Sequence, residues 1–190
     1  PALAAPAEFA LSENCPPGFE LSGGQCKLRS MYQMYDSLQD AGVGGLKTGL
    51  PSYRDGFSPQ QIDLGRYLFF DPVLSGDGTV SCASCHNPAL GFSDGRGQSV
   101  GAHGQTVKRS AQSLWNVAFG QRFFWDARAT TLEEQMRGPL YDAREMANNP
   151  EQLLRTLNDI PLYRELFRQA WPEDFQTAEA TIRLEQVEMA

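Results

Sequence analysis

Two cysteines and a histidine lie within five residues of each other in the stretch SCASCHNPALGFSDG, residues 81–95. Cys82, Cys85 and His86 form the pattern C-x-x-C-H, which is the attachment signal for haem c. Each thiol adds to a haem vinyl group to give a thioether bond, and the adjacent imidazole reaches the iron from the proximal side. The sequence therefore predicts a covalently bound haem c. What lies on the opposite face of the iron decides the chemistry.

Two other kinds of site use cysteines at this spacing. A zinc site needs four ligands, and the soft donors that remain are His103 and the pair Cys15 and Cys26. A thioredoxin-like dithiol belongs to a βαβ context, which this sequence lacks. Haem c is favoured over both.

Three residues are candidates for the distal face of the iron. Met146 follows His86 by sixty residues, a separation that suits a His/Met electron-transfer cytochrome. His103 lies in the flexible stretch GAHGQ and can swing a ligand towards the iron. Glu145 can instead lie over an open iron as an acid–base group. Composition and spacing leave all three open.

Local signals place this motif in a mainly α chain with long loops. Ser58-Pro59-Gln60-Gln61 reads as an N-cap, a proline at N1 and a glutamine at N3, which predicts a helix through about Phe70. Further helix signals begin at Thr131, at Asn149 and along PLYRELFRQAW. No segment alternates long enough for a substantial sheet. We expect a cytochrome c-like helical domain over residues 58–190, with long loops around a covalently attached haem.

Residues 1–57 form a separate N-terminal extension in this interpretation. Cys15 and Cys26 bracket two turn signals around a short extended piece, which predicts a disulfide-closed hairpin rather than a metal or second redox site. Such a short closed loop stabilises by about 3 kcal/mol on the chain-entropy account. One helix is expected next, because apolar residues from Leu28 to Leu38 follow helical spacing and Gly42 comes near its end.

Composition and charge exclude some partners. The net charge of −7 argues against a nucleic-acid surface, and it suits either docking to a basic soluble partner or plain solubility. The longest apolar runs are a few residues, so no membrane span is predicted. The start, PALAAPAEFAL, reads as the stretch left after a signal peptide was removed. The helical spacing of residues 182–189 stops without a stop signal, which suggests a fragment of a longer protein.

Several longer motifs resemble the N-terminal domain of the bacterial di-haem cytochrome c peroxidase and MauG family. They are LGRYLFFDPVLSGDGTVSCASCHNPALGFSDG, SLWN, FFWDARATTLEEQMRGPL and REM, in the same order and at matching separations from about Ile62 to the end. The resemblance implies a peroxidatic haem in this domain. It also implies a second haem c on a C-terminal domain, which this chain lacks because it has no second C-x-x-C-H.

The resemblance also implies roles for individual residues. His86 matches the proximal ligand, and Gln135, Pro139 and Glu145 match the residues of the distal pocket. Trp125 matches the tryptophan between the two haems, whereas Trp115 in SLWN is interpreted as a packing residue.

Two positions depart from the family pattern. Ser110 stands where many relatives have an asparagine that contributes to a calcium site, and serine is a poorer calcium ligand than an amide, so calcium binding is in doubt. GAHGQ carries one extra residue before His103 compared with the family histidine that blocks the iron in some resting members. His103 is therefore only an approximate match to that distal ligand.

Two hypotheses of different classes follow. The first is a periplasmic peroxidase-type enzyme that reduces hydrogen peroxide with electrons from a cytochrome c or a cupredoxin, or that uses peroxide to oxidise a partner protein as MauG does. The second is an electron-transfer cytochrome c with His86 and Met146 both bound to the iron.

Overall fold

The structure, a computed structural model of the chain, describes residues 9–29 and 56–190. It is mainly helical, as the sequence predicts, and the described residues hold one two-stranded sheet. The elements follow in the order β1 (Phe19–Ser22), β2 (Gln25–Leu28), α1 (Pro59–Phe70), α2 (Cys82–Cys85), α3 (Leu132–Tyr141), α4 (Pro150–Asp159), α5 (Pro161–Ala170) and α6 (Leu184–Met189). Across these described ranges, no helix is long and apolar enough to cross a membrane.

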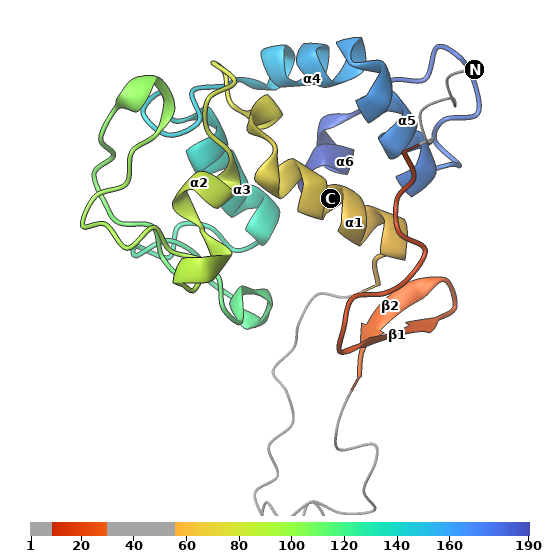
Figure 1. The fold of residues 1–190 in the computed structure, drawn as a ribbon, viewed down its shortest axis with the longest axis horizontal. Coiled ribbons are helices and arrows are strands. Elements are labelled where there is room, and N and C mark those ends of the chain that lie inside the picture. The colour runs from red at the N-terminus through yellow and green to blue at the C-terminus, as the bar shows by residue number, and fades with distance from the viewer. Residues whose placement is uncertain (1–8, 30–55) are drawn as a thin grey trace, which may run out of the picture.

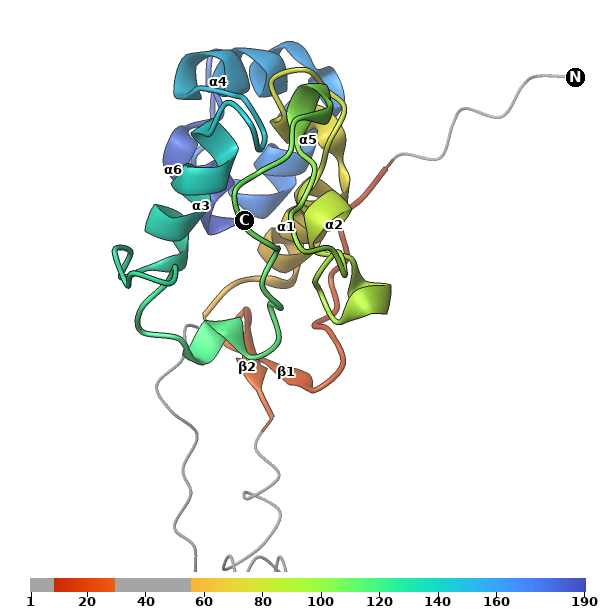
Figure 2. The ribbon, with the colours of Figure 1, turned by 90° about the vertical axis from the view of Figure 1, so that its left-hand side faces the viewer.

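The N-terminal hairpin forms as predicted. Strands β1 and β2 pair antiparallel around Gly23 and Gly24, and both glycines have positive φ, as a tight two-residue hairpin turn requires. Cys15 and Cys26 form a disulfide. The Cys26 N–H donates to the carbonyl of Phe57 at 2.8 Å, which ties the hairpin to the segment before α1 (Figure 2).

The helix expected after this hairpin is only partly testable. Leu28, the first residue of its apolar stripe, belongs to strand β2 rather than to a helix, because the hairpin register pairs it with Phe19. The rest of the stripe lies outside the described residues. The helix therefore stays a prediction beyond residue 29.

Helix α1 begins where the sequence predicts. Ser58 Oγ accepts from the Gln61 N–H at 3.2 Å, and Gln61 Oε1 accepts from the Ser58 N–H at 2.9 Å. These two bonds satisfy the N–H groups of Ser58 and Gln61, and Pro59 at the first position has no N–H to satisfy. The helix ends at Phe70, because Asp71 turns to an extended conformation.

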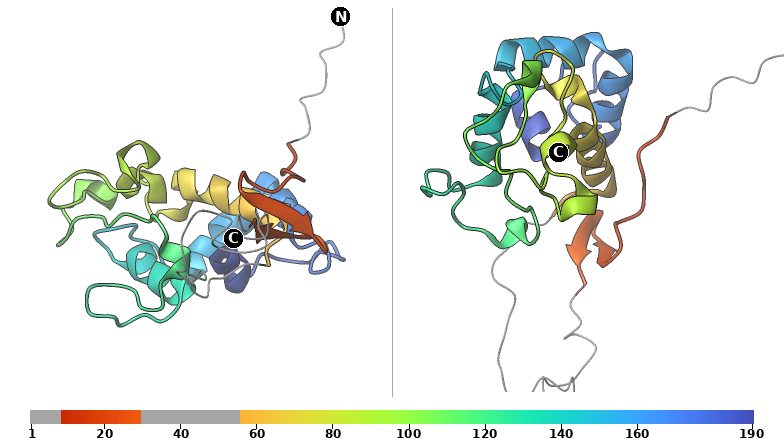
Figure 3. Two further views of the ribbon diagram at one scale, coloured as in Figure 1. Left: turned by 90° about the horizontal axis from the view of Figure 1, so that it is seen from below. Right: turned by 60° about the vertical axis from the view of Figure 1, so that its left-hand side comes forward.

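The hydrophobic core gathers where α1, α4, α5 and α6 meet (Figure 1). Leu153 and Leu157 lie one helical turn apart on α4 and are fully buried, as are Leu64 of α1 and Phe167 of α5. The long segment between α1 and α3, green to teal in Figure 3, extends to one side of this helical half. It carries α2 and only short 3-10 turns, so the core helices act as the base on which the loops rest.

One polar bond inside this core predicts a measurable loss of stability. The buried Tyr163 hydroxyl donates to Asp71 Oδ2 at 2.7 Å, while Asp71 Oδ1 accepts from the Val73 N–H at 2.8 Å. Tyr163→Phe leaves the carboxylate without this donor. We expect the free energy of unfolding, measured in urea, to fall by about 1.5–3 kcal/mol.

Tyr141→Phe is the matched control. The Tyr141 hydroxyl is buried without a hydrogen-bond partner among the described residues, so its removal is expected to be neutral or slightly stabilising. Equal losses in both variants would contradict the importance of the bond between Tyr163 and Asp71.

Candidate functional site

The C-x-x-C-H motif forms a single helical turn. The backbone N–H of His86 donates to the carbonyl of Cys82 at 2.9 Å, and the N–H of Ser81 donates to Ser84 Oγ at 3.0 Å. Cys82 and Cys85 are both free thiols. Their i, i+3 spacing puts them on one face of the turn, and Cys82 also packs against the hydrophobic core.

The surroundings of the two thiols favour haem attachment over the two rival chemistries. Burial raises the pKa of Cys82 to about 11, and burial followed by the charges of Asp94 and Glu145 raises the pKa of Cys85. A redox dithiol needs a lowered thiol pKa. A thioether sulfur does not ionise, so its burial has no such cost. Among the described residues, no three His, Cys, Asp or Glu side chains are grouped to hold a metal ion such as zinc.

The imidazole of His86 is oriented by a backbone carbonyl. Its Nδ1 lies 3.0 Å from the carbonyl oxygen of Phe92. A carbonyl can only accept a hydrogen bond, so Nδ1 carries the proton and Nε2 keeps its lone pair for a metal. This is the usual way in which a protein fixes the tautomer and the ring angle of a ligating histidine. The residues present therefore fit a haem held through two thioethers and His86 Nε2.

The turn that carries Glu145 is positioned by main-chain contacts. The carbonyl of Glu145 accepts from the Ala102 N–H at 2.6 Å, and the carbonyl of Met146 accepts from the Gly76 N–H at 2.7 Å. A Cβ atom on Gly101 would lie 2.1 Å from the carbonyl oxygen of Arg144. One on Gly76 would lie 2.0 Å from a backbone oxygen of the same turn. Both close approaches require glycine.

Glu145 is half-buried, and its carboxyl group has no hydrogen bond to any described residue. Burial raises its pKa, as does the nearby charge of Asp142, whereas Arg128 and Arg144 act in the opposite direction. The charge of Glu145 also contributes to the raised pKa of Cys85. The two segments are close because Val100, whose carbonyl lies 3.9 Å from the Cys85 thiol, comes two residues before Ala102, which donates to the Glu145 carbonyl. An unpaired carboxyl with a raised pKa is suited to proton transfer.

Gln135 and Pro139 lie four residues apart on α3. The Gln135 side chain is half-buried, and its amide has no hydrogen-bond partner in the described ranges. Pro139 has no N–H, so the Gln135 carbonyl lacks the donor that an ordinary helix would supply. The carbonyl of Pro139 accepts from the Met146 N–H at 3.1 Å, which links α3 to the Glu145 turn.

Trp125 lies at the tip of a turn that folds back on α3. Phe123 and Ala129 form a β-bridge across this turn, and the ring of Phe124 packs so closely on Gly138 that an added Cβ would lie 2.7 Å from it. Arg128 stacks over the Phe124 ring at 3.4 Å. The Trp125 side chain itself is 75% exposed, so it projects from the site rather than into the core.

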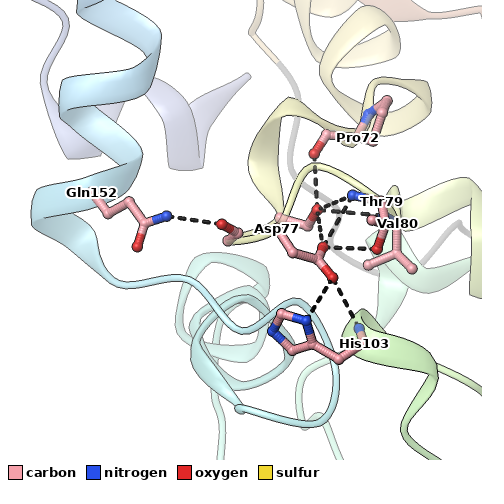
Figure 4. A network of polar contacts seen from close by, with 8 residues as sticks. Pro72, Asp77, Thr79, Val80, His103 and Gln152 are labelled. Carbon is pink, nitrogen blue, oxygen red and sulfur yellow. Dashed lines mark hydrogen bonds and ion pairs between the residues drawn. The ribbon is translucent and has the colours of Figure 1, made fainter.

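His103 and Met146, the two candidate distal ligands, have different surroundings. Met146 is 8% exposed and belongs to the hydrophobic core. His103 has a positive φ, and its Nδ1 lies 3.2 Å from Asp77 Oδ2, which also accepts from the His103 backbone N–H at 2.9 Å (Figure 4). Hydrogen bonds, first of all from the Thr79 hydroxyl, lower the pKa of Asp77 to about 2. The imidazole is thus paired with a carboxylate in this structure.

Sequence reasoning missed three contributors to the site. Arg128 could have been found as a charge inside the FFWDARA motif, and Asp77 as an acidic residue between two glycines before the haem motif. The carbonyl of Phe92 carries no signal in the sequence. Trp115 is not a core residue, because its side chain is 66% exposed, but its ring packs edge-to-face against Phe92.

Comparisons with known proteins point to one family. The family model described as di-haem cytochrome c peroxidase matches residues 59–190. The methylamine utilization protein MauG of Methylorubrum extorquens is 43% identical over 114 residues, which is 60% of this chain and 32% of that protein. The cytochrome c551 peroxidase of Pseudomonas aeruginosa is 41% identical over 116 residues, or 61% of this chain and 34% of that protein.

Solved structures agree with these relatives. A MauG-like protein associated with microbial copper homeostasis has a TM-score of 0.65 at 31% identity, covering 77% of this chain and 43% of the other. The diheme peroxidase BthA of Burkholderia thailandensis has a TM-score of 0.57 at 31% identity, covering 73% of this chain and 39% of the other.

The matched region corresponds to about a third of the length of these sequence relatives. The family model's match, residues 59–190, includes α1, the C-x-x-C-H turn, α3 and the Glu145 turn. Because the family model covers well over half of the residues, this chain belongs to the di-haem cytochrome c peroxidase family.

Proposed function

We propose that this chain is the peroxidatic haem domain of a periplasmic peroxidase-type enzyme. Cys82 and Cys85 would hold haem c through thioether bonds, and His86 Nε2 would bind its iron. The observation that carries the proposal is the half-buried residue Glu145, whose carboxyl has no hydrogen bond to described residues. Its turn lies beside the haem-attachment turn, because the Ala102 N–H donates to the Glu145 carbonyl at 2.6 Å and the Cys85 thiol lies 3.9 Å from the carbonyl of Val100. The match to the peroxidase family supports the same assignment.

Glu145 performs the proton transfers in this proposal. Its carboxylate takes a proton from one oxygen of hydrogen peroxide and returns it to the other, so that the O–O bond breaks and water leaves. The haem, when bound, supplies the electrons for this cleavage. Hydrogen peroxide, two electrons and two further protons give two molecules of water. Burial raises the pKa of Glu145, which makes its carboxylate a better proton acceptor than an exposed glutamate.

The other site residues orient the peroxide, shape the pocket and relay electrons. The Gln135 amide orients peroxide or the leaving water by hydrogen bonding without adding a charge near the iron. Pro139 shapes the pocket and, through its carbonyl, holds the turn of Glu145 in place. Trp125 relays electrons between this haem and a second haem c, which would lie on a C-terminal domain beyond the matched third of the relatives.

The electron source is a small redox protein, either a cytochrome c or a cupredoxin. The same site would serve the oxidation of a partner protein by peroxide, since the relatives include both a cytochrome c551 peroxidase and MauG. His103 is proposed as a distal ligand only in a state in which its pairing with Asp77 is broken. Ser110 gives no amide ligand for calcium.

Optical and EPR spectra of the oxidised, haem-loaded protein test this function. We expect a high-spin haem that takes up cyanide, either at once or after addition of one reducing equivalent. A haem that stays low-spin and refuses cyanide in both states would instead support an electron-transfer cytochrome with His86 and Met146 on the iron. In that case Met146→Leu would change the spectrum sharply.

The pH dependence of peroxide turnover follows from the charges around Glu145. The base must be ionised, so turnover is expected to fall as pH drops through a pKa that lies above the usual glutamate range. Asp142→Asn removes a charge that raises this pKa and should move the acid limb to lower pH. Arg128→Ala removes a charge that lowers it and should move the limb to higher pH.

Arg155→Ala provides the control for both variants. Arg155 pairs with Glu151 on the exposed face of α4, so its loss should leave the pH profile unchanged. Shifts of the same sign in Asp142→Asn and Arg128→Ala would contradict the assignment of Glu145 as the titrating group.

A further inference from the structure

A strained residue connects His86 to an aromatic group at the surface. Phe92, whose carbonyl accepts from His86 Nδ1, has a φ of +58°, a conformation that a bulky side chain rarely adopts. Its N–H donates to the carbonyl of Asn87 at 2.8 Å, which closes the loop after the haem motif. This backbone geometry aims the Phe92 carbonyl at the imidazole. Such strain persists where the surrounding structure requires it, and it is often found at functional sites.

The ring of the same residue contacts Trp115. The two ring centroids are 5.4 Å apart at 88°, an edge-to-face pair. The Ser113 hydroxyl donates to the carbonyl of Gly91 at 2.6 Å and accepts from the Trp115 N–H at 3.3 Å, so the Trp115 backbone is tied to the Phe92 loop. The indole is nevertheless 66% exposed. A large aromatic group is thus held firmly in place and left open to solvent.

We propose that Trp115 is a surface electron-exchange residue for the haem held by His86, a role that rests on the proposed function. After peroxide has oxidised the haem, the Trp115 indole gives it one electron by way of Phe92 and His86. The Nε1 proton of the indole passes to solvent, which reaches the ring. An external one-electron donor then reduces the indole, and the proton returns from solvent.

This position is separate from that of Trp125. The turn of Trp125 packs on α3, and its Arg128 acts on the pKa of Glu145, whereas Trp115 is joined to the loop that orients His86. The domain then has two separate aromatic residues through which electrons pass. Trp125 serves the second haem, and Trp115 serves a donor or an oxidisable partner that reaches the surface near the His86 loop.

The experiment follows the complete, haem-loaded protein after addition of hydrogen peroxide. Without a donor, mass spectrometry should find oxygen added to Trp115 at least about ten times more often than in the haem-free protein under the same peroxide. The buried Trp171, at 5% exposure, should stay unmodified in both. With a one-electron donor, stopped-flow spectra should show that Trp115→Phe slows re-reduction of the haem at least fivefold. The rate at which peroxide oxidises the haem should be unchanged in this variant.

Two further variants separate electron exchange from simple loss of apolar surface. Trp115→Tyr keeps an oxidisable ring and should recover much of the rate. Leu90→Ala removes a neighbouring apolar side chain that is 53% exposed and should leave the rate unchanged.

The outcomes distinguish the two levels of the proposal. A haem that does not react with peroxide at all would overturn the proposed function and this inference with it. A haem that reacts normally, with unchanged re-reduction in Trp115→Phe and no haem-dependent oxidation of Trp115, would overturn this inference alone. An equal slowing in Leu90→Ala and Trp115→Phe would also overturn it, because the indole would then act only as contact surface.

Discussion

Glu145→Gln is expected to lower peroxide turnover by the haem-loaded protein about 10²–10⁴-fold, the usual contribution of a positioned acid–base group. Glutamine keeps the size of the side chain and removes its ability to take up a proton. The main-chain contacts that position the turn do not involve the side chain, so the fold should be retained. The optical spectrum of the resting haem should change little. Steady-state peroxide consumption and circular dichroism would measure the two effects separately.

Glu151→Gln is the matched control for this change. Glu151 forms an exposed i, i+4 pair with Arg155 on α4, and such pairs contribute little to stability. Its turnover should equal that of the unchanged protein. If Glu145→Gln kept its turnover within about threefold, Glu145 would not be the proton-transfer group, since general acid–base catalysis contributes far more.

Gly101→Ala is expected to destabilise the fold and to displace the Glu145 turn together. The added Cβ would lie 2.1 Å from the carbonyl oxygen of Arg144 and 2.5 Å from that of Glu145. Backbone atoms cannot rotate away as the end of a side chain can, so the loop and the turn must separate. Overpacking of this kind costs about 1–3 kcal/mol, occasionally more. We also expect a loss of peroxide turnover in the fraction that remains folded.

Gly97→Ala tests whether this effect belongs to the site. Gly97 lies in the same glycine-rich segment, has no positive φ and would meet nothing within 4 Å of an added Cβ. Its free energy of unfolding should stay within about 0.5 kcal/mol of that of the unchanged protein, as is usual for surface substitutions. Equal stability of the Gly97 and Gly101 variants would show that the loop and the Glu145 turn do not touch as described.

The parts of the fold that depend on neighbouring residues could be predicted from the sequence. The cap at Ser58, the hairpin closed by Cys15 and Cys26, and the start of α4 after Asn149 are each encoded within a few residues. The start of the C-terminal helix was predicted less accurately. Ile182 fits the helical spacing but lies before α6, where it is buried in the core in a non-helical conformation.

The arrangement of the long loops could not be predicted in this way. The pair of Asp77 and His103 joins residues 26 positions apart, and no periodic pattern reports such a contact. The positive φ of Phe92 belongs to a residue type that rarely adopts it, so local preference points elsewhere. The exposure of Trp115 likewise depends on how the loop after residue 91 folds back.

The backbone positions the Glu145 turn, and the side chain at position 145 determines its reactivity. Its position depends on carbonyl and N–H groups and on two glycines that approach the backbone. The carboxyl at position 145 makes no hydrogen bond to the described residues, so the backbone of the turn can present different side chains at this position. A library of substitutions at this single position should therefore yield folded proteins that differ in reactivity, and the domain offers a scaffold for redesigning haem chemistry.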